Sequence, residues 1–245
     1  AATANAKVVK TPLAVWKCPS SVAPDISRQT IYGFFGYTPN GEDWVIDFAR
    51  SDYVVSSGVR AGYGEFTYNG NEGGDRNGPT RVAKCGGGGD GGRSGIRDCT
   101  DGTSNTIILG ERTGGSTIYC NSTPCSASVL AQMTNEEGYT GLPADVLGGL
   151  NGLGWADILI GETWLQGCNY DGTLTTVVVN GTTDTGGPCA INCTNERGRG
   201  FHSFHVGGTH ILLCDGSVRF INQSISPVTL GGLITADKGE VVGDF

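Results

Sequence analysis

The chain has 245 residues, a net charge of −8 and 42 glycines. This length suffices for one domain with its own hydrophobic core, and the glycine content indicates many turns. The acidic balance argues against nucleic acid or an anionic membrane as partner, because both require clustered Lys and Arg. No window approaches the ~18 consecutive apolar residues of a membrane-spanning helix.

Residues 1–17 contain no apolar run long enough for a membrane span or for the core of a signal peptide, so the chain as given is expected to be soluble. Further along, runs of β-branched and aromatic residues predict strands. These strands are expected over Ile31–Gly36, Trp44–Phe48, Thr106–Leu109, Leu174–Val179, His210–Cys214 and Ser217–Ile221. Short helices are predicted near Ser128–Glu137 and Pro227–Ala236.

Polar stretches rich in Gly and Asn interrupt these elements at Asn69–Pro79, Gly86–Gly95 and Asn180–Pro188. Each is brief, and strand signals resume on both sides, so they are expected to be surface loops rather than domain linkers. We therefore predict a single domain over residues 1–245. Within it, 112–170 is expected to be an elaboration peculiar to this chain, and 201–245 to form a hairpin and tail.

The hairpin prediction depends on an Asp-Gly pair at residues 215–216 between two β-prone runs. Such a pair is a strong signal for a two-residue turn. Closing that turn would pair Leu213 with Val218 and Ile211 with Phe220. The predicted hairpin therefore has these four apolar side chains on one buried face.

Four short blocks are distinctive: Cys18-Pro19-Ser20, residues 98–106 with Gly110-Glu111, the segment containing His205, Gly207, Gly208, Asp215 and Gly216, and residues 239–245. In this order they resemble a large bacterial family of prepilin-like proteins of unknown function with a C-terminal His-(nine residues)-Asp-Gly signature. The resemblance implies a pilin-like head of the α+β class, predominantly β, with an antiparallel sheet and long Gly-rich loops. Family members normally begin with an apolar pilin helix, which residues 1–17 lack; cleavage, deletion and original absence of that helix stay open.

Nine cysteines favour disulfide bonds and an oxidising compartment, extracellular or at the cell surface. Spacing suggests the pairs Cys120–Cys125, Cys189–Cys193, Cys85–Cys99 and Cys18–Cys168. Cys214 is then expected to be the unpaired thiol. A cysteine-rich zinc site is the alternative, although no paired CxxC motif supports it.

A calcium site is the first candidate for bound metal, because oxygen-bearing side chains crowd one segment: Asp98, Asp101, Asn105 and Glu111. Pseudopilin heads fix a loop with calcium, so the resemblance also favours this ion. A turn at Asp101, with side chains accepting backbone N–H groups, is the alternative. Residues 69–75 form a second candidate loop, and no cofactor other than calcium is expected.

The three histidines of the chain, His202, His205 and His210, lie within nine residues of one another and could bind zinc together with Asp215. Strand alternation would instead send His202 and His205 to opposite faces. In that case His205 would order the Gly-Gly turn at 207–208 through hydrogen bonds, and the other two would lie on the surface.

A hydrolase could be drawn with Ser203 or Ser217 as nucleophile, His205 as base and Asp215 as its partner. No Gly-x-Ser-x-Gly elbow surrounds either serine, so no enzymatic activity is expected. Sequons make Asn121 and Asn180 the glycosylation candidates in exposed loops.

The sequence therefore predicts an exported, non-enzymatic structural protein, a pilin- or pseudopilin-like subunit that assembles with copies of itself into a filament. The apolar tail residues Val241, Val242 and Phe245 are expected to dock on a neighbouring subunit by strand addition. The alternative is a monomeric, calcium-dependent surface module that binds carbohydrate or mediates adhesion. Copies of the chain itself and surface glycans are thus the expected partners.

Overall fold

A computed structural model gives the fold of the protein. It describes residues 5–36, 38–68, 76–80, 95–142, 145–151, 153–157, 160, 163–179, 181–240, 242–243 and 245. Several predictions lie outside the described residues: the Cys85–Cys99 pairing, the calcium loop at 69–75, the Asn180 sequon and the docking of Val241.

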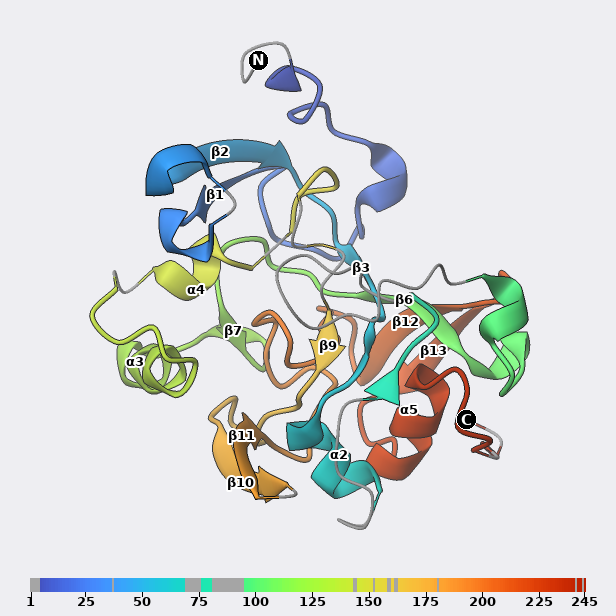
Figure 1. The fold of residues 1–245 in the computed structure, drawn as a ribbon. Coiled ribbons are helices and arrows are strands. Elements are labelled where there is room, and N and C mark those ends of the chain that lie inside the picture. Colours follow the sequence, from blue (N-terminus) through green and yellow to red (C-terminus); the bar gives the residue numbers. More distant parts are fainter. Residues whose placement is uncertain are drawn as a thin grey trace.

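Short strands and helices alternate along the chain, and the strands predominate (Figure 1). The α-helices are α2 (Ala61–Thr67), α3 (Ala127–Glu136), α4 (Val146–Gly149) and α5 (Pro227–Ile234). The 3₁₀ helices are η1 (Ala14–Trp16), η2 (Gly33–Phe35), η3 (Pro39–Gly41), η4 (Ile96–Asp98) and η5 (Thr103–Asn105). The predicted α+β class with a predominance of β-structure is confirmed.

The strands are β1 (Ile26–Ile31), β2 (Trp44–Ala49), β3 (Tyr53–Val55), β4 (Gly58–Val59), β5 (Arg76–Asn77), β6 (Ile107–Glu111), β7 (Tyr119–Cys120), β8 (Thr123–Pro124), β9 (Trp164–Leu165), β10 (Thr175–Val179), β11 (Thr182–Gly186), β12 (Gly208–Leu213) and β13 (Val218–Asn222). Most form antiparallel hairpins, and β4 and β9 are a parallel pair. The strands predicted near β2, β6, β10, β12 and β13 are therefore present.

The strand predicted over Ile31–Gly36 is wrong. The chain forms η2 there, and the strand β1 comes before it and pairs with β2. The inward-facing positions of β1 include Ser27 and Gln29, both almost fully buried, whereas Ile26 is exposed. Because polar side chains occupy the buried face, hydrophobic alternation did not indicate this strand.

Helices α3 and α5 begin at recognisable sequence signals. Ser126 Oγ accepts the backbone N–H of Val129 at the start of α3, and Ser226 Oγ accepts that of Thr229 at the start of α5. Pro227 is the first residue of α5, where a missing N–H removes no helical hydrogen bond. Both helices lie where the sequence predicts them.

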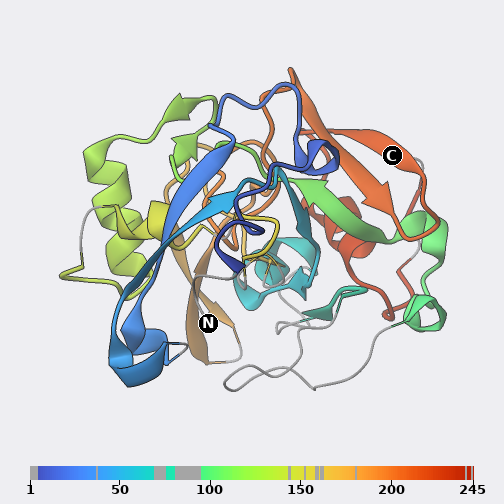
Figure 2. The same cartoon turned by 90° about the horizontal axis from the view of Figure 1, so that it is seen from above.

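The largest sheet joins distant parts of the chain in the strand order β13–β12–β6–β3, and all its neighbours are antiparallel. Helix α5 packs against this sheet, next to the C-terminal hairpin, as two views at right angles show (Figure 1 and Figure 2). Leu230 and Leu233 of α5 belong to the same buried cluster as Ile211, Leu213 and Ile221 of the hairpin. This cluster is the main hydrophobic core.

The hairpin between β12 and β13 has a register one residue away from the predicted one. Leu212 pairs with Val218, rather than Leu213 with Val218. Residues 214–216 therefore form a three-residue connection, in which Gly216 has a φ of 88°. A glycine in the left-handed region is typical of the last position of such loops.

The one-residue shift changes which side chains face the core, because side chains alternate along a strand. Ile211 and Leu213 are buried, whereas Val218 and Phe220 are exposed. The predicted face of four apolar residues is thus divided between two faces. Of the two exposed residues, Val218 lines the cavity described below.

Two of the predicted disulfide bonds are present, Cys120–Cys125 and Cys189–Cys193. The predicted Cys18–Cys168 bond is wrong: Cys168 lies in a buried cluster that includes Cys189, and Cys18 lies beside His205. Cys214 is a free cysteine, as predicted, and its Sγ lies 3.6 Å from that of Cys99, which is also free. Within the described part of the chain, no helix is long and apolar enough to cross a membrane.

Candidate functional site

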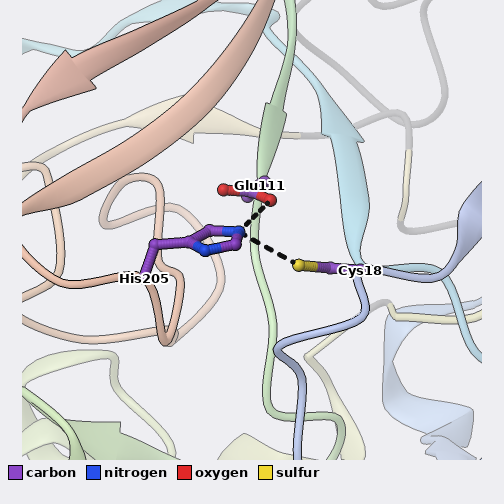
Figure 3. A group of neighbouring side chains, drawn as sticks. All are labelled: Cys18, Glu111 and His205. Carbon is purple, nitrogen blue, oxygen red and sulfur yellow. Dashed lines mark hydrogen bonds and ion pairs between the residues drawn. The ribbon is translucent and has the colours of Figure 1, made fainter.

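Three side chains from distant parts of the chain meet beside the four-stranded sheet: Cys18, Glu111 and His205 (Figure 3). The Nε2 atom of His205 lies 3.4 Å from Cys18 Sγ and 3.2 Å from Glu111 Oε1. One potential ligand atom from each residue lies within 4.8 Å of the others. In the described ranges, no other three His, Cys, Asp or Glu side chains gather this closely.

Glu111 is the last residue of β6, and only 1% of its side chain is exposed. Its Oε2 atom accepts hydrogen bonds from Thr209 Oγ1 at 3.1 Å and from the backbone N–H of His210 at 2.8 Å. These bonds compensate for the loss of water around a buried carboxylate. They also orient the second oxygen, Oε1, toward His205.

The turn before β12 is ordered by Ser203 rather than by the His205 ring. Ser203 Oγ accepts the backbone N–H of His205 at 3.2 Å and donates to the Gly208 carbonyl at 2.7 Å. Gly207 has a φ of 86° and completes the turn. The expectation that the His205 ring holds the Gly-Gly turn is therefore wrong, and the ring faces Cys18 and Glu111 instead.

Cys18 follows η1 and is held by its backbone. Its N–H donates to Asp52 Oδ2 at 2.9 Å, and the buried Asp52 is itself paired with Arg50 at 3.1 Å. Burial raises the pKa of the Cys18 thiol, so the thiol is protonated at neutral pH. Ser20 Oγ lies close to the cluster, 3.0 Å from Cys18 Sγ.

A cavity of about 520 Å³ lies next to this cluster, and Glu111, His205 and His210 contribute its polar groups. Most of the remaining wall is apolar and comes from both the N-terminal segment and the sheet: Val15, Trp16, Pro19, Leu109, Leu212 and Val218. A concave, largely apolar site with a few converging polar groups is typical of binding sites. The register shift in the hairpin is what places Leu212 and Val218 in this wall.

The predicted zinc set of three histidines is not assembled. His202 is buried away from the cluster, where its ring contacts the Asn121 carbonyl at 2.8 Å and Thr113 Oγ1 at 3.3 Å. His210 does lie near the cluster, with its ring centroid 4.7 Å from that of His205. Asp215 is exposed at the hairpin turn, where it accepts two hydrogen bonds from Ser217.

The predicted calcium ligands have other partners in the structure. Asp98 accepts the backbone N–H of residue 95, and Asp101 accepts those of residues 238–239. Asn105 donates to the Asp101 carbonyl at 3.5 Å, whereas Glu111 belongs to the cluster with His205. Asp98 and Asp101 thus have the backbone-capping role that was the alternative, and calcium binding stays a prediction.

The C-terminal tail packs on its own chain. Val242 and Phe245 contact the main hydrophobic core, and the Arg219 guanidinium lies 4.8 Å from the centre of the Phe245 ring. Glu240 pairs with Arg76 at 2.8 Å. Within one chain these two side chains therefore pack on the core, and docking of the tail on a neighbouring subunit stays a prediction.

Asn121 is exposed, as its role as a glycosylation candidate requires, and its Nδ2 donates to the Tyr170 carbonyl at 3.3 Å. Glycosylation at this position stays a prediction.

Comparison with known proteins gives one match. The sequence profile of a family described as "Protein of unknown function (DUF1559)" matches residues 1–227. The chain belongs to this family. No curated protein and no solved structure matches the chain.

Sequence reasoning treated Cys18, Glu111 and His205 separately, as a disulfide partner, a calcium ligand and a turn residue. A signal for their meeting was nevertheless present, because each residue lies in a different one of the four blocks that distinguish this DUF1559 sequence. The remaining block, the tail, contacts Asp101 of the second block. Segments that stand out separately in the sequence are therefore neighbours in space.

Proposed function

We propose that this protein is an exported, non-enzymatic structural subunit, related to pilin-like proteins, that assembles with copies of itself through the outer side of β13 and the adjoining cavity. The observation that carries the proposal is an exposed apolar edge. β13 is the last strand of its sheet, with no strand on its outer side among the described residues (Figure 1). It exposes the side chains of Val218 and Phe220.

An unpaired edge strand presents free backbone N–H and C=O groups, which favour pairing with a strand of another chain. Natural proteins usually protect such an edge with charges, prolines or covering segments. Here Val218 is 65% exposed and also borders the apolar cavity. An incoming strand could therefore pair with β13 and place apolar side chains in that cavity.

Export is supported by two disulfide bonds, Cys120–Cys125 and Cys189–Cys193, which persist in oxidising compartments.

A non-enzymatic role is supported by the geometry at His205. In a Cys–His–acid triad the base contacts the nucleophile through one ring nitrogen and the acid through the other. Here Nε2 faces both Cys18 and Glu111.

The test is the oligomeric state of the purified chain over a range of concentrations, by light scattering after size exclusion, with electron microscopy of the largest species. Val218→Lys should raise the concentration of half-assembly more than about tenfold, because a buried lysine costs more than about 1.4 kcal/mol. Val178→Lys is the matched control, since Val178 is 66% exposed on a different hairpin. A wild-type chain that stays monomeric, or equal effects of both substitutions, would refute the proposal.

A monomeric binding module is the second candidate function, and the cavity favours it because Glu111, His205 and His210 converge on an apolar pocket. Its expected ligand is a small molecule or glycan bound without self-association. Two results would support this candidate instead. The chain would stay monomeric at every concentration, and addition of a glycan library would slow hydrogen exchange at the backbone amides of the cavity residues.

A further inference from the structure

The ring nitrogen Nε2 of His205 is approached by three groups at once. Cys18 Sγ lies at 3.4 Å, Glu111 Oε1 at 3.2 Å and Ser20 Oγ at 3.4 Å. An imidazole nitrogen carries either one proton or one lone pair, so it makes one good hydrogen bond. Several polar groups that crowd one atom are better explained as ligands arranged around a common point (Figure 3).

We propose that Cys18, Glu111 and His205 bind a zinc ion between them. Tetrahedral zinc with ordinary bond lengths places sulfur and nitrogen ligands about 3.6 Å apart, and nitrogen and oxygen ligands about 3.4 Å apart. The corresponding distances are 3.4 Å and 3.2 Å. For these two pairs of ligand atoms, the side chains therefore need to move only slightly to admit the ion.

The chemistry of the donors selects the metal. A thiolate, an imidazole and a carboxylate are the ligand types that zinc combines in proteins. Calcium requires six to eight oxygen ligands, and the cluster offers oxygen only from Glu111 and Ser20. Zinc binding would convert the protonated Cys18 thiol to a thiolate, with release of the proton to solvent.

Neighbouring groups already hold the ligands in position. Thr209 Oγ1 and the His210 N–H occupy Oε2 of Glu111, which leaves Oε1 directed at the cluster. The Cys18 backbone is fixed by Asp52. Such outer contacts orient metal ligands and contribute to metal affinity. The fourth position of a tetrahedral ion is left for Ser20 Oγ or for water.

The ion would connect three segments: the N-terminal segment at residue 18, the end of β6, and the turn before β12. It would thereby fix one wall of the cavity, because Pro19 and His205 both line it. Zinc binding does not depend on self-assembly, so the two proposals can fail separately.

The experiment measures zinc binding to the 245-residue chain after removal of metal with a chelator, by isothermal titration and metal analysis. The expected result is one zinc ion per chain. Cys18→Ser and His205→Gln should each abolish stoichiometric uptake, and Thr209→Val should weaken binding about 10–100-fold. The control Cys214→Ser removes a different free thiol and should bind like the wild type.

Cobalt is the second probe, because a thiolate–cobalt charge-transfer band appears only when a cysteine coordinates the metal. This band should be present in the wild type and in Cys214→Ser, and absent in Cys18→Ser. Circular dichroism of each variant shows whether it is folded. Absence of zinc uptake by the folded wild type, or unchanged binding by folded Cys18→Ser, would overturn the proposal. The Val218→Lys variant should bind zinc like the wild type, so its effect on self-assembly can be measured separately from zinc binding.

Discussion

Two regions of the molecule that bury charged side chains differ in how the charges are compensated. Near β9, Arg199 is fully buried and its guanidinium pairs with Glu196 at 2.8 Å and with Glu137. Beside β6, the buried Glu111 faces two histidines, and no Arg or Lys among the described residues is paired with it.

The difference separates a structural role from a binding role. A buried guanidinium with two carboxylate partners has its charge satisfied within the fold, although burial lowers the pKa of Arg199. The polar groups around Glu111 converge on one atom at the edge of a cavity. Substitutions in the first region should therefore lower the stability of the fold. Substitutions in the second region should leave the protein folded but weaken its binding of a ligand or metal ion.

The largest expected effect is at Arg199. Arg199→Ala leaves Glu196 buried without its guanidinium partner, and breaking a buried pair in this way typically costs about 3–5 kcal/mol. Urea unfolding followed by circular dichroism measures this loss. Arg28→Ala is the control, because Arg28 pairs with Asp47 on the surface and its loss should change the unfolding free energy little. Equal effects of the two substitutions would show that the buried pair of Arg199 contributes no more to stability than the surface pair of Arg28.

A smaller effect is expected from His202, which is buried three residues before His205. Burial lowers the pKa of the folded His202 below its ordinary value of 6.5, so the native ring stays neutral. Below that value the unfolded chain binds a proton that the native ring does not, so the contribution of His202 to the unfolding free energy falls as the pH drops.

Unfolding curves between about pH 7.5 and about pH 5.5 measure this fall. In His202→Gln the slope with pH should be smaller than in the wild type. An unchanged slope would show that another group causes the pH dependence. Carboxylates such as Asp47, whose pKa is lowered by Arg28, act only at more acidic pH.

The smallest expected effect on stability is at His205. The ring is partly exposed, and its contacts to Cys18 and Glu111 are long, so His205→Gln should change the unfolding free energy by no more than about 1 kcal/mol. Thermal and urea unfolding of the metal-free protein provide the measurement. A loss as large as that of Arg199→Ala would make the cluster a structural element of the core.

Local features of the sequence were sufficient wherever the determining contacts are close in the chain. The short disulfides Cys120–Cys125 and Cys189–Cys193 span a few residues, and α3 and α5 begin at their own capping serines. The existence of the C-terminal hairpin was likewise indicated by its Asp-Gly pair. Strand β1 was missed because its buried face carries Ser27 and Gln29.

The sequence by itself determined the β-rich class, the main local elements and the blocks that distinguish the chain. Tertiary structure alone decided the hairpin register and the meeting of Cys18, Glu111 and His205. His205 lies 187 residues from Cys18 and 94 from Glu111, and no local pattern fixes which distant side chains meet across a sheet. The register depends on which set of alternate side chains packs in the hydrophobic core, and in this structure Ile211 and Leu213 pack there.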